Sequence, residues 1–167
     1  MDPALQNFFY TLFLTLHNLS RWLVIVFAGL ALYWAYSGWF KKQEWTRSAD
    51  RAGILFTSII DLQLLLGLVL YFLFSPATPP LFANFSAAMK SPYNRFFGLE
   101  HVAVMVVALI LAHATRAAFR RVKDPVTRHR NTAIGFTLTL LVILAAIPWP
   151  FMANVARPWF RLFGLAF

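Results

Sequence analysis

Residues 16–38 read LHNLSRWLVIVFAGLALYWAYSG, and this stretch decides the fold. It is long and apolar enough to cross a bilayer as a helix, because about 20 apolar residues span the hydrocarbon core. Two ionisable side chains, His17 and Arg21, stand four residues apart and so share one helical face. The same face continues through residues that are mostly small: Val24, Ala28, Ala31, Ala35 and Gly38. Small residues let another helix approach closely, so this face is predicted to be buried, with His17 and Arg21 pointing inward.

The composition of the whole chain also indicates a membrane protein. Its 167 residues are 60% hydrophobic and only 13% charged, which is unlike a soluble domain of this size. Four stretches are apolar enough to span a bilayer, at about residues 16–40, 53–74, 97–119 and 131–147. We therefore expect an all-α integral membrane protein, folded as a single four-helix transmembrane bundle over residues 1–167 and surrounded by lipid.

Three segments outside these spans have the aromatic and polar content of interfacial segments. They are residues 4–15 at the N-terminus, the loop at 81–97 and the C-terminal tail. Residues 4–15 are predicted either to extend the first helix outward or to lie in the interface as a separate piece. The start of the chain lacks the basic residues of a cleavable signal peptide.

The basic residues predict the orientation in the membrane. Of the 15 Lys and Arg residues, ten lie in the loops at 41–51 and 116–130, which share one side of the bilayer. Four lie on the other side, and Arg21 lies within the first helix. Because cytoplasmic loops are enriched in Lys and Arg, both termini are predicted to lie outside, in the cytoplasmic (inner) membrane of a bacterium.

The remaining composition excludes several classes of function. The net charge of +9 reflects topology and anionic lipid, because no nucleic-acid-binding motif accompanies it. The chain has no cysteine, which excludes disulfides, cysteine-held iron–sulfur clusters, thiolate catalysis and covalent haem attachment. No hydrolytic triad, phosphate-binding loop or zinc-protease motif is present, so we expect no catalysis by this chain alone.

His101 is the second histidine predicted to face the interior. It opens the span at 97–119 and heads a stripe of mostly small residues on its own helix: Met105, Ala108, Ala112 and Thr115. At 1.5 Å per residue, His17 and His101 lie about 35 Å and about 27 Å from the inner ends of their helices, a difference that tilt absorbs. Two neutral imidazoles on facing helices are what a six-coordinate haem iron requires, so one haem b is predicted between them.

Arg21 and Glu100 are predicted to lie beside the same site. Arg21 is expected to neutralise a haem propionate or to pair with Glu100, which directly precedes His101. A purely structural alternative is an Arg21–Glu100 ion pair, with His17 and His101 engaged in interhelical hydrogen bonds.

Two further ionisable residues lie within the predicted spans. Asp61 is about halfway along its span, where a buried carboxylate could relay protons to a quinone or make a structural hydrogen bond. His113 lies on a bulkier face of the third helix and is expected to meet a lipid headgroup, a quinone or a partner subunit. The chain has enough histidines for a second haem between His113 and His129, but the expected positions of these two residues suit a shared haem poorly.

Several segments resemble a known group of proteins. They are LHNLSRW at 16–22, DLQLLLG at 61–67 with LYF at 70–72, RFFGLEH at 95–101 and IPWP at 147–150. Together they resemble small four-helix bacterial membrane proteins labelled cytochrome b-like, over nearly the whole chain. The resemblance implies His17 and His101 as haem ligands. Members of the group often carry histidine where this chain has Asp61, so it implies no ligand on the second helix.

Three functions are left open by the sequence. The first is a b-type cytochrome-like subunit that carries electrons among the other membrane subunits of a respiratory or photosynthetic complex. The second is a cofactor-free accessory subunit, for which 18 Phe, 6 Trp and 5 Tyr would supply contact area. The third is a chlorophyll-binding subunit, in which a single axial histidine suffices.

Overall fold

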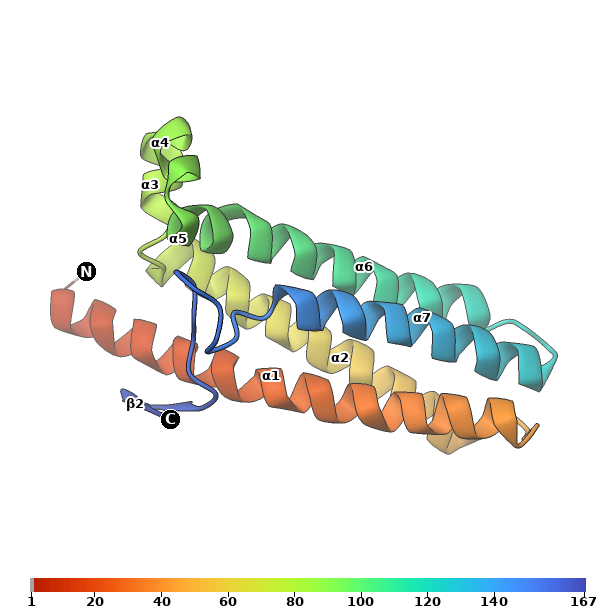
Figure 1. Ribbon diagram of the computed structural model, residues 1–167. Coiled ribbons are helices and arrows are strands. Elements are labelled where there is room, and N and C mark those ends of the chain that lie inside the picture. The colour runs from red at the N-terminus through yellow and green to blue at the C-terminus, as the bar shows by residue number, and fades with distance from the viewer. Residues whose placement is uncertain (1) are drawn as a thin grey trace.

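The computed structural model describes residues 2–167 and is dominated by helices. Four helical segments are long and apolar enough to cross a membrane: Pro3–Phe40, Arg47–Phe74, Pro92–Phe119 and Pro125–Ala146. They run side by side, and both termini lie at the same end of the molecule, called the terminal end below (Figure 1). The opposite end, the loop end, carries the connections at 41–46 and 120–124. The prediction of an all-helical chain with four membrane-length helices is confirmed.

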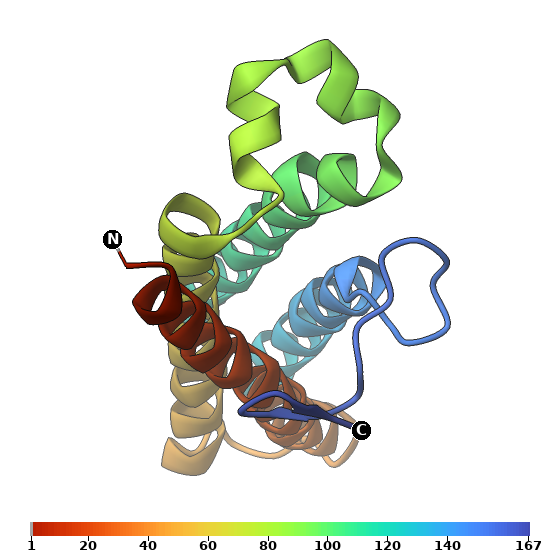
Figure 2. The same ribbon diagram turned by 90° about the vertical axis from the view of Figure 1, so that its left-hand side faces the viewer.

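Viewed from the terminal end, the four long helices form a ring (Figure 2). Helix α1 (Pro3–Phe40) packs against both α2 (Arg47–Val69) and α7 (Pro125–Ala146). Helix α6 (His101–Phe119) packs closely against α7. Contacts between α2 and α6 are much sparser than those of the other neighbouring pairs. The α2–α6 seam is therefore the least tightly closed side of the ring.

The small-residue face of α1 is buried, as its spacing predicts. Ala28, Ala31 and Ala35 are almost completely buried, whereas Leu23 and Leu30 on the opposite face are 47% and 40% exposed. Large exposed apolar side chains of this kind occur on all four long helices. Such a surface suits contact with lipid rather than with water.

The core between the other helices combines alanine with a few large rings. Ala108 and Ala112 of α6 are fully buried, and Phe56 of α2 meets Phe136 of α7 edge to face with ring centres 5.1 Å apart. Where α6 approaches α7, a Cβ atom at Gly135 would overlap the Thr115 side chain. The two helices can lie this close only because residue 135 is glycine.

Helices α2 and α7 each begin six residues earlier than the hydropathy predicts. The Thr46 side chain caps α2 by accepting a hydrogen bond from the Ala49 N–H at 3.2 Å. The Asp124 carboxylate caps α7 by accepting one from the Thr127 N–H at 2.8 Å, and Pro125 suits the first turn. The Thr127 contacts also lower the pKa of the Asp124 carboxyl. The first turns of both helices are polar and precede the apolar stretches that hydropathy detects. Hydropathy alone therefore places the starts of α2 and α7 too late.

The N-terminal residues are part of the first helix. Residues 4–15, for which an interfacial segment was the alternative, continue α1 without a break. The Asp2 carboxylate caps this helix by accepting a hydrogen bond from the Ala4 N–H at 2.9 Å, and Pro3 occupies its first turn. Of the two alternatives that the sequence left open, the outward extension of the first helix is confirmed and the separate interfacial piece is wrong.

The segment between α2 and α6 folds into short helices that project from the terminal end (Figures 1 and 2). They are α3 (Thr78–Ala83), α4 (Phe85–Lys90) and α5 (Pro92–Arg95). Two π-helical turns flank them: η1 (Leu70–Phe74) continues α2, and η2 (Phe96–Glu100) leads into α6. The predicted loop is thus mostly helical.

The C-terminal tail folds back over the terminal end. Strand β1 (Arg161–Leu162) pairs antiparallel with β2 (Leu165–Ala166), and β1 contacts α1. Gly164 in the connecting turn has φ of 97°, in the left-handed region that favours glycine. The tail is thereby held as a small hairpin against the first helix.

We expect Gly135→Ala to destabilise the protein by about 1–3 kcal/mol, because the added methyl group must displace Thr115. Thermal unfolding of the purified protein in detergent measures the change. Gly29→Ala is the matched control, since among the described residues no atom outside its own stretch of helix lies within 4 Å of its added Cβ, and alanine favours helix. Equal stabilities of the two variants would contradict the close approach of α6 and α7.

Candidate functional site

A cavity of about 150 Å³ lies between the four long helices near the terminal end. Most of its lining is apolar. Its basic side chains come from α1, α6 and the C-terminal tail: His17, Arg21, His101, Arg157 and Arg161. No Asp or Glu among residues 2–167 lines it. This combination suits an apolar ligand that carries negative charge.

The structure brings His17 and His101 together in this cavity. Their ring centres lie 6.3 Å apart, and the ring planes are inclined by 74°. Within the part of the chain that the structure describes, no group of three or more His, Cys, Asp or Glu side chains is arranged to hold a metal ion. A metal at this site would therefore depend on these two imidazoles for its protein ligands.

A backbone carbonyl fixes the orientation of the His101 ring. The Nδ1 atom lies 2.8 Å from the carbonyl oxygen of Ala146, at the end of α7. A carbonyl can only accept, so Nδ1 carries the proton and donates it. The Nε2 atom of a neutral His101 ring then keeps its lone pair, which is the state in which an imidazole binds a metal.

The His17 ring lies against a glycine on α2. A Cβ atom at Gly67 would lie 3.1 Å from Cε1 of His17, so any larger residue would press on the ring. The Nδ1 atom of His17 is buried and has no hydrogen-bond partner among the described residues. His17 is thus closely packed on one side, and its Nδ1 atom has no hydrogen-bond partner among the described residues.

Gln63 of α2 ties this part of α1 to its neighbour. Its Nε2 donates to the backbone carbonyl of His17 at 2.9 Å, and its Oε1 accepts from the Ser20 hydroxyl. Both Gln63 and Gly67 belong to the DLQLLLG segment, but the sequence offered no reason to place them beside His17. Their positions follow from the packing of α2 against α1.

Arg21 holds the C-terminal tail. Its Nη2 donates to the carbonyl oxygens of Trp159 at 2.8 Å and of Pro158 at 3.3 Å. Its Nε atom is buried and has no partner within residues 2–167. The tail in turn brings Arg157 and Arg161 into the cavity lining, which the sequence pattern did not predict.

Glu100 does not pair with Arg21, so this predicted ion pair is wrong. Its Oε1 lies 2.8 Å from Nε of Arg95, and both side chains are about half exposed. These two residues are five apart and are connected by the π-helical turn, which places residues i and i+5 on one face. The ring of Phe96 meets that of His101 at 5.7 Å in the same way. Glu100 is not among the cavity-lining residues.

Asp61 and His113, predicted separately, form a pair across the α2–α6 seam. The Nε2 atom of His113 lies 2.7 Å from Oδ1 of Asp61. Asp61 is near the middle of the Arg47–Phe74 segment, yet its side chain is 50% exposed and that of His113 is 47% exposed. The expectation of a buried Asp61 is therefore wrong. The pair lies on the outward surface of a membrane-length helix.

His129 belongs to the loop end and does not share a site with His113. Its ring packs on Trp45 with centres 4.6 Å apart, and its Nε2 lies 3.4 Å from the carbonyl oxygen of Glu44. It is buried beside Gly38, where an added Cβ would overlap the ring. The geometry thus argues against a second site formed by His113 and His129.

Comparisons with protein-family models, with curated proteins and with solved structures find no match to this chain. The resemblance to cytochrome b-like membrane proteins therefore stays a prediction, based on the segments quoted above.

We expect Arg21→Leu to release the C-terminal tail. Two tail amides are bonded to α1, Arg161 N–H to Asn18 Oδ1 at 3.0 Å and Phe163 N–H to Thr15 Oγ1 at 3.3 Å. Their hydrogen exchange should accelerate about tenfold or more, because a hydrogen bond from a charged donor contributes about 1.5–3 kcal/mol.

The control for this prediction is Arg95→Leu, which removes an arginine from the same end of the molecule but from an exposed ion pair. It should leave tail exchange unchanged. Unaltered exchange in Arg21→Leu itself would show that the tail does not depend on Arg21.

Proposed function

We propose that the chain is a membrane-embedded electron-transfer subunit that holds one haem b between His17 and His101. The observation that carries the proposal is the 6.3 Å separation of the two ring centres. A ring nitrogen lies roughly 1 Å from the ring centre and a metal–imidazole bond is about 2 Å long, so imidazoles on opposite sides of a metal have centres about 6 Å apart. A haem would supply one-electron exchange between ferric and ferrous iron.

The surroundings of the two histidines support the same assignment. The bond from His101 Nδ1 to Ala146 leaves Nε2 as the ligating atom. Arg21, Arg157 and Arg161 line the cavity without a neighbouring carboxylate, and they would neutralise the two propionates of a haem. The cavity of about 150 Å³ is the size that holds a small aromatic ring. A porphyrin would therefore have to displace flexible lining side chains, such as those of Leu68 and Met105.

The orientation that we propose places the terminal end outside and the loop end in the cytoplasm of a bacterium. Ten of the 15 Lys and Arg residues lie in or beside the loop end. The cavity would then lie toward the outer face of the cytoplasmic membrane. With little of its mass outside the membrane, the chain would exchange electrons through other membrane subunits of a respiratory or photosynthetic complex.

The Asp61–His113 pair supports a quinone as the redox partner of this subunit. Asp61 is near the middle of the Arg47–Phe74 segment, and the pair is half exposed at the loosest seam of the helical ring. A quinone dissolved in the bilayer would reach a pair exposed on this surface. A quinol loses a proton with each electron, and a carboxylate–imidazole pair can accept that proton.

A reduced-minus-oxidised absorption spectrum, with a pyridine haemochrome assay, tests the haem site. We expect a b-type α band and about one haem per chain. His17→Ala and His101→Ala should each abolish the low-spin band, because each removes one of the two imidazoles that would hold the haem. His113→Ala is the matched control and should keep it. A haem-free protein, isolated together with its partners, would contradict the proposal and favour a cofactor-free accessory subunit. Bound chlorophyll would favour a pigment-binding subunit.

We expect Asp61→Asn to slow haem reduction by a quinol about 100-fold or more while leaving the haem spectrum unchanged, because a positioned proton acceptor contributes about 10²–10⁴ in rate. Stopped-flow absorption measures the rate. Asp124→Asn is the control: it removes a carboxylate from the loop end but keeps a side chain that can cap a helix. Equal rates in the two variants would exclude Asp61 from proton transfer.

A further inference from the structure

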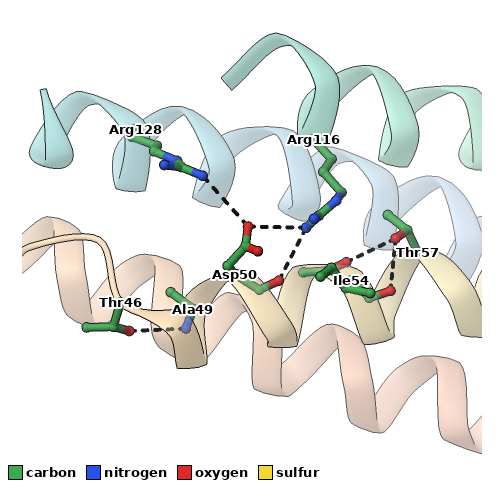
Figure 3. Close-up of polar contacts among 8 residues, drawn as sticks. Thr46, Ala49, Asp50, Ile54, Thr57, Arg116 and Arg128 are labelled. Carbon is green, nitrogen blue, oxygen red and sulfur yellow. Dashed lines mark hydrogen bonds and ion pairs between the residues drawn. The ribbon is translucent and has the colours of Figure 1, made fainter. Parts of the chain in front are cut away.

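A second cluster of polar side chains lies at the loop end, about a carboxylate (Figure 3). Asp50, in the first turn of α2, lies between Arg116 of α6 and Arg128 of α7. Its Oδ1 is 3.6 Å from Nη1 of Arg116 and 3.7 Å from Nη2 of Arg128. Arg116 Nη1 also donates to the Asp50 backbone carbonyl at 3.2 Å. Both contacts with the carboxylate are longer than a direct charged hydrogen bond, so Asp50 only partly satisfies the two guanidinium groups.

The cluster carries more positive than negative charge. Arg120 lines the same small cavity as Asp50, Arg116 and Arg128, so the lining holds three arginines and one carboxylate. The side chains of Arg116 and Arg128 are only 23% and 17% exposed. This lining carries a net positive charge, and two of its three guanidinium groups are held partly away from water, which favours the binding of an anion.

Two buried donors beside this cavity lack an acceptor. The Nε atom of Arg128 and the Nε1 atom of Trp45 are buried and have no hydrogen-bond partner among residues 2–167. The Arg128 guanidinium lies over the Trp45 ring, 4.0 Å from its centre, which fixes its position. An unsatisfied buried donor costs about 1–3 kcal/mol, so a pair of them indicates a missing acceptor.

The cavity itself sets the size of the group that can enter. Its volume is about 20 Å³, and its inner wall is formed by Ala31, Ala35, Gly53 and Phe136. That space holds one oxygen-sized group, because a single water needs roughly 10–15 Å³. The rest of a larger ligand would lie at the rim, where Arg120 is exposed. A Cβ atom at Gly53 would lie 3.3 Å from Nη1 of Arg116, so glycine leaves room for this guanidinium.

We propose that this cluster binds a phosphate group, with one phosphate oxygen entering the cavity beside Arg116 and Arg128. The planar guanidinium fork matches the geometry of phosphate oxygens. The cluster lies where membrane-length helices end, which is the level of phospholipid headgroups, and basic pockets between helices on that side bind anionic lipids. The same chemistry would also accept free inorganic phosphate. The site is independent of the proposed haem.

Thermal unfolding of the whole chain in a neutral detergent tests the site and its source of phosphate. Three additions are compared at equal concentration: short-chain phosphatidylglycerol, short-chain phosphatidylcholine and inorganic phosphate. We expect phosphatidylglycerol to raise the unfolding temperature and phosphatidylcholine not to. Stabilisation by inorganic phosphate to the same extent would assign the site to the free anion, whereas no stabilisation by either anion would overturn the proposal.

Arg128→Gln is the variant that probes the cluster, and Arg121→Gln is its matched control. Both remove one positive charge from the same basic segment, but Arg121 is exposed and does not line the cavity. We expect at least tenfold weaker phosphatidylglycerol binding for Arg128→Gln and wild-type binding for Arg121→Gln, as counted by native mass spectrometry. Arg128→Lys, which keeps the charge without the fork, should give an intermediate value. Equal losses of phosphatidylglycerol binding in Arg128→Gln and Arg121→Gln would show that the lipid binds through general surface charge. That result would overturn the proposal.

Discussion

A polar group inside an apolar layer must find its partner within the protein, because the surroundings offer none, and this constraint organises the molecule. Gln63 bonds two groups of α1, Arg21 bonds two carbonyls of the tail, and His101 bonds the carbonyl of Ala146. Each of these bonds joins two separate elements of the chain. Polar side chains that would be costly in hydrocarbon thus connect the helices and fix the tail.

Of the six buried side-chain nitrogen and oxygen atoms that have no hydrogen-bond partner among the described residues, four belong to residues that line the two cavities, and the other two are Thr78 Oγ1 and His129 Nδ1. Near the terminal end, Nδ1 of His17 and Nε of Arg21 are buried without partners among the described residues, and both residues line the larger cavity. At the loop end the same holds for Nε of Arg128 and Nε1 of Trp45 at the smaller cavity. Buried donors and acceptors are normally satisfied, so these four unpartnered atoms are consistent with the two proposals of a bound ligand.

Helical periodicity predicted much of the fold and the histidine pair, but it could not predict which helices are neighbours. The face shared by His17 and Arg21 is the buried face of α1 because small residues repeat along it. The contact between Asp61 and His113 depends on how α2 and α6 are rotated at their seam, which no pattern within one helix encodes. The partner of Glu100 was mispredicted because a π-helical turn, invisible to hydropathy, changes the spacing that brings residues together.

The same π-helical turn has a consequence for variation in chain length. A π turn accommodates roughly one residue more than an α turn, and one residue corresponds to about 100° of rotation. Removing one residue from Phe96–Glu100 would restore a plain α-helix and swing the projecting helices α3 to α5 about the bundle axis. Helix α6 and the His101 ring would keep their register, because everything beyond the turn is held by α7. The turn would therefore isolate the cavity-lining helix α6 from insertions and deletions in the exposed segment before it.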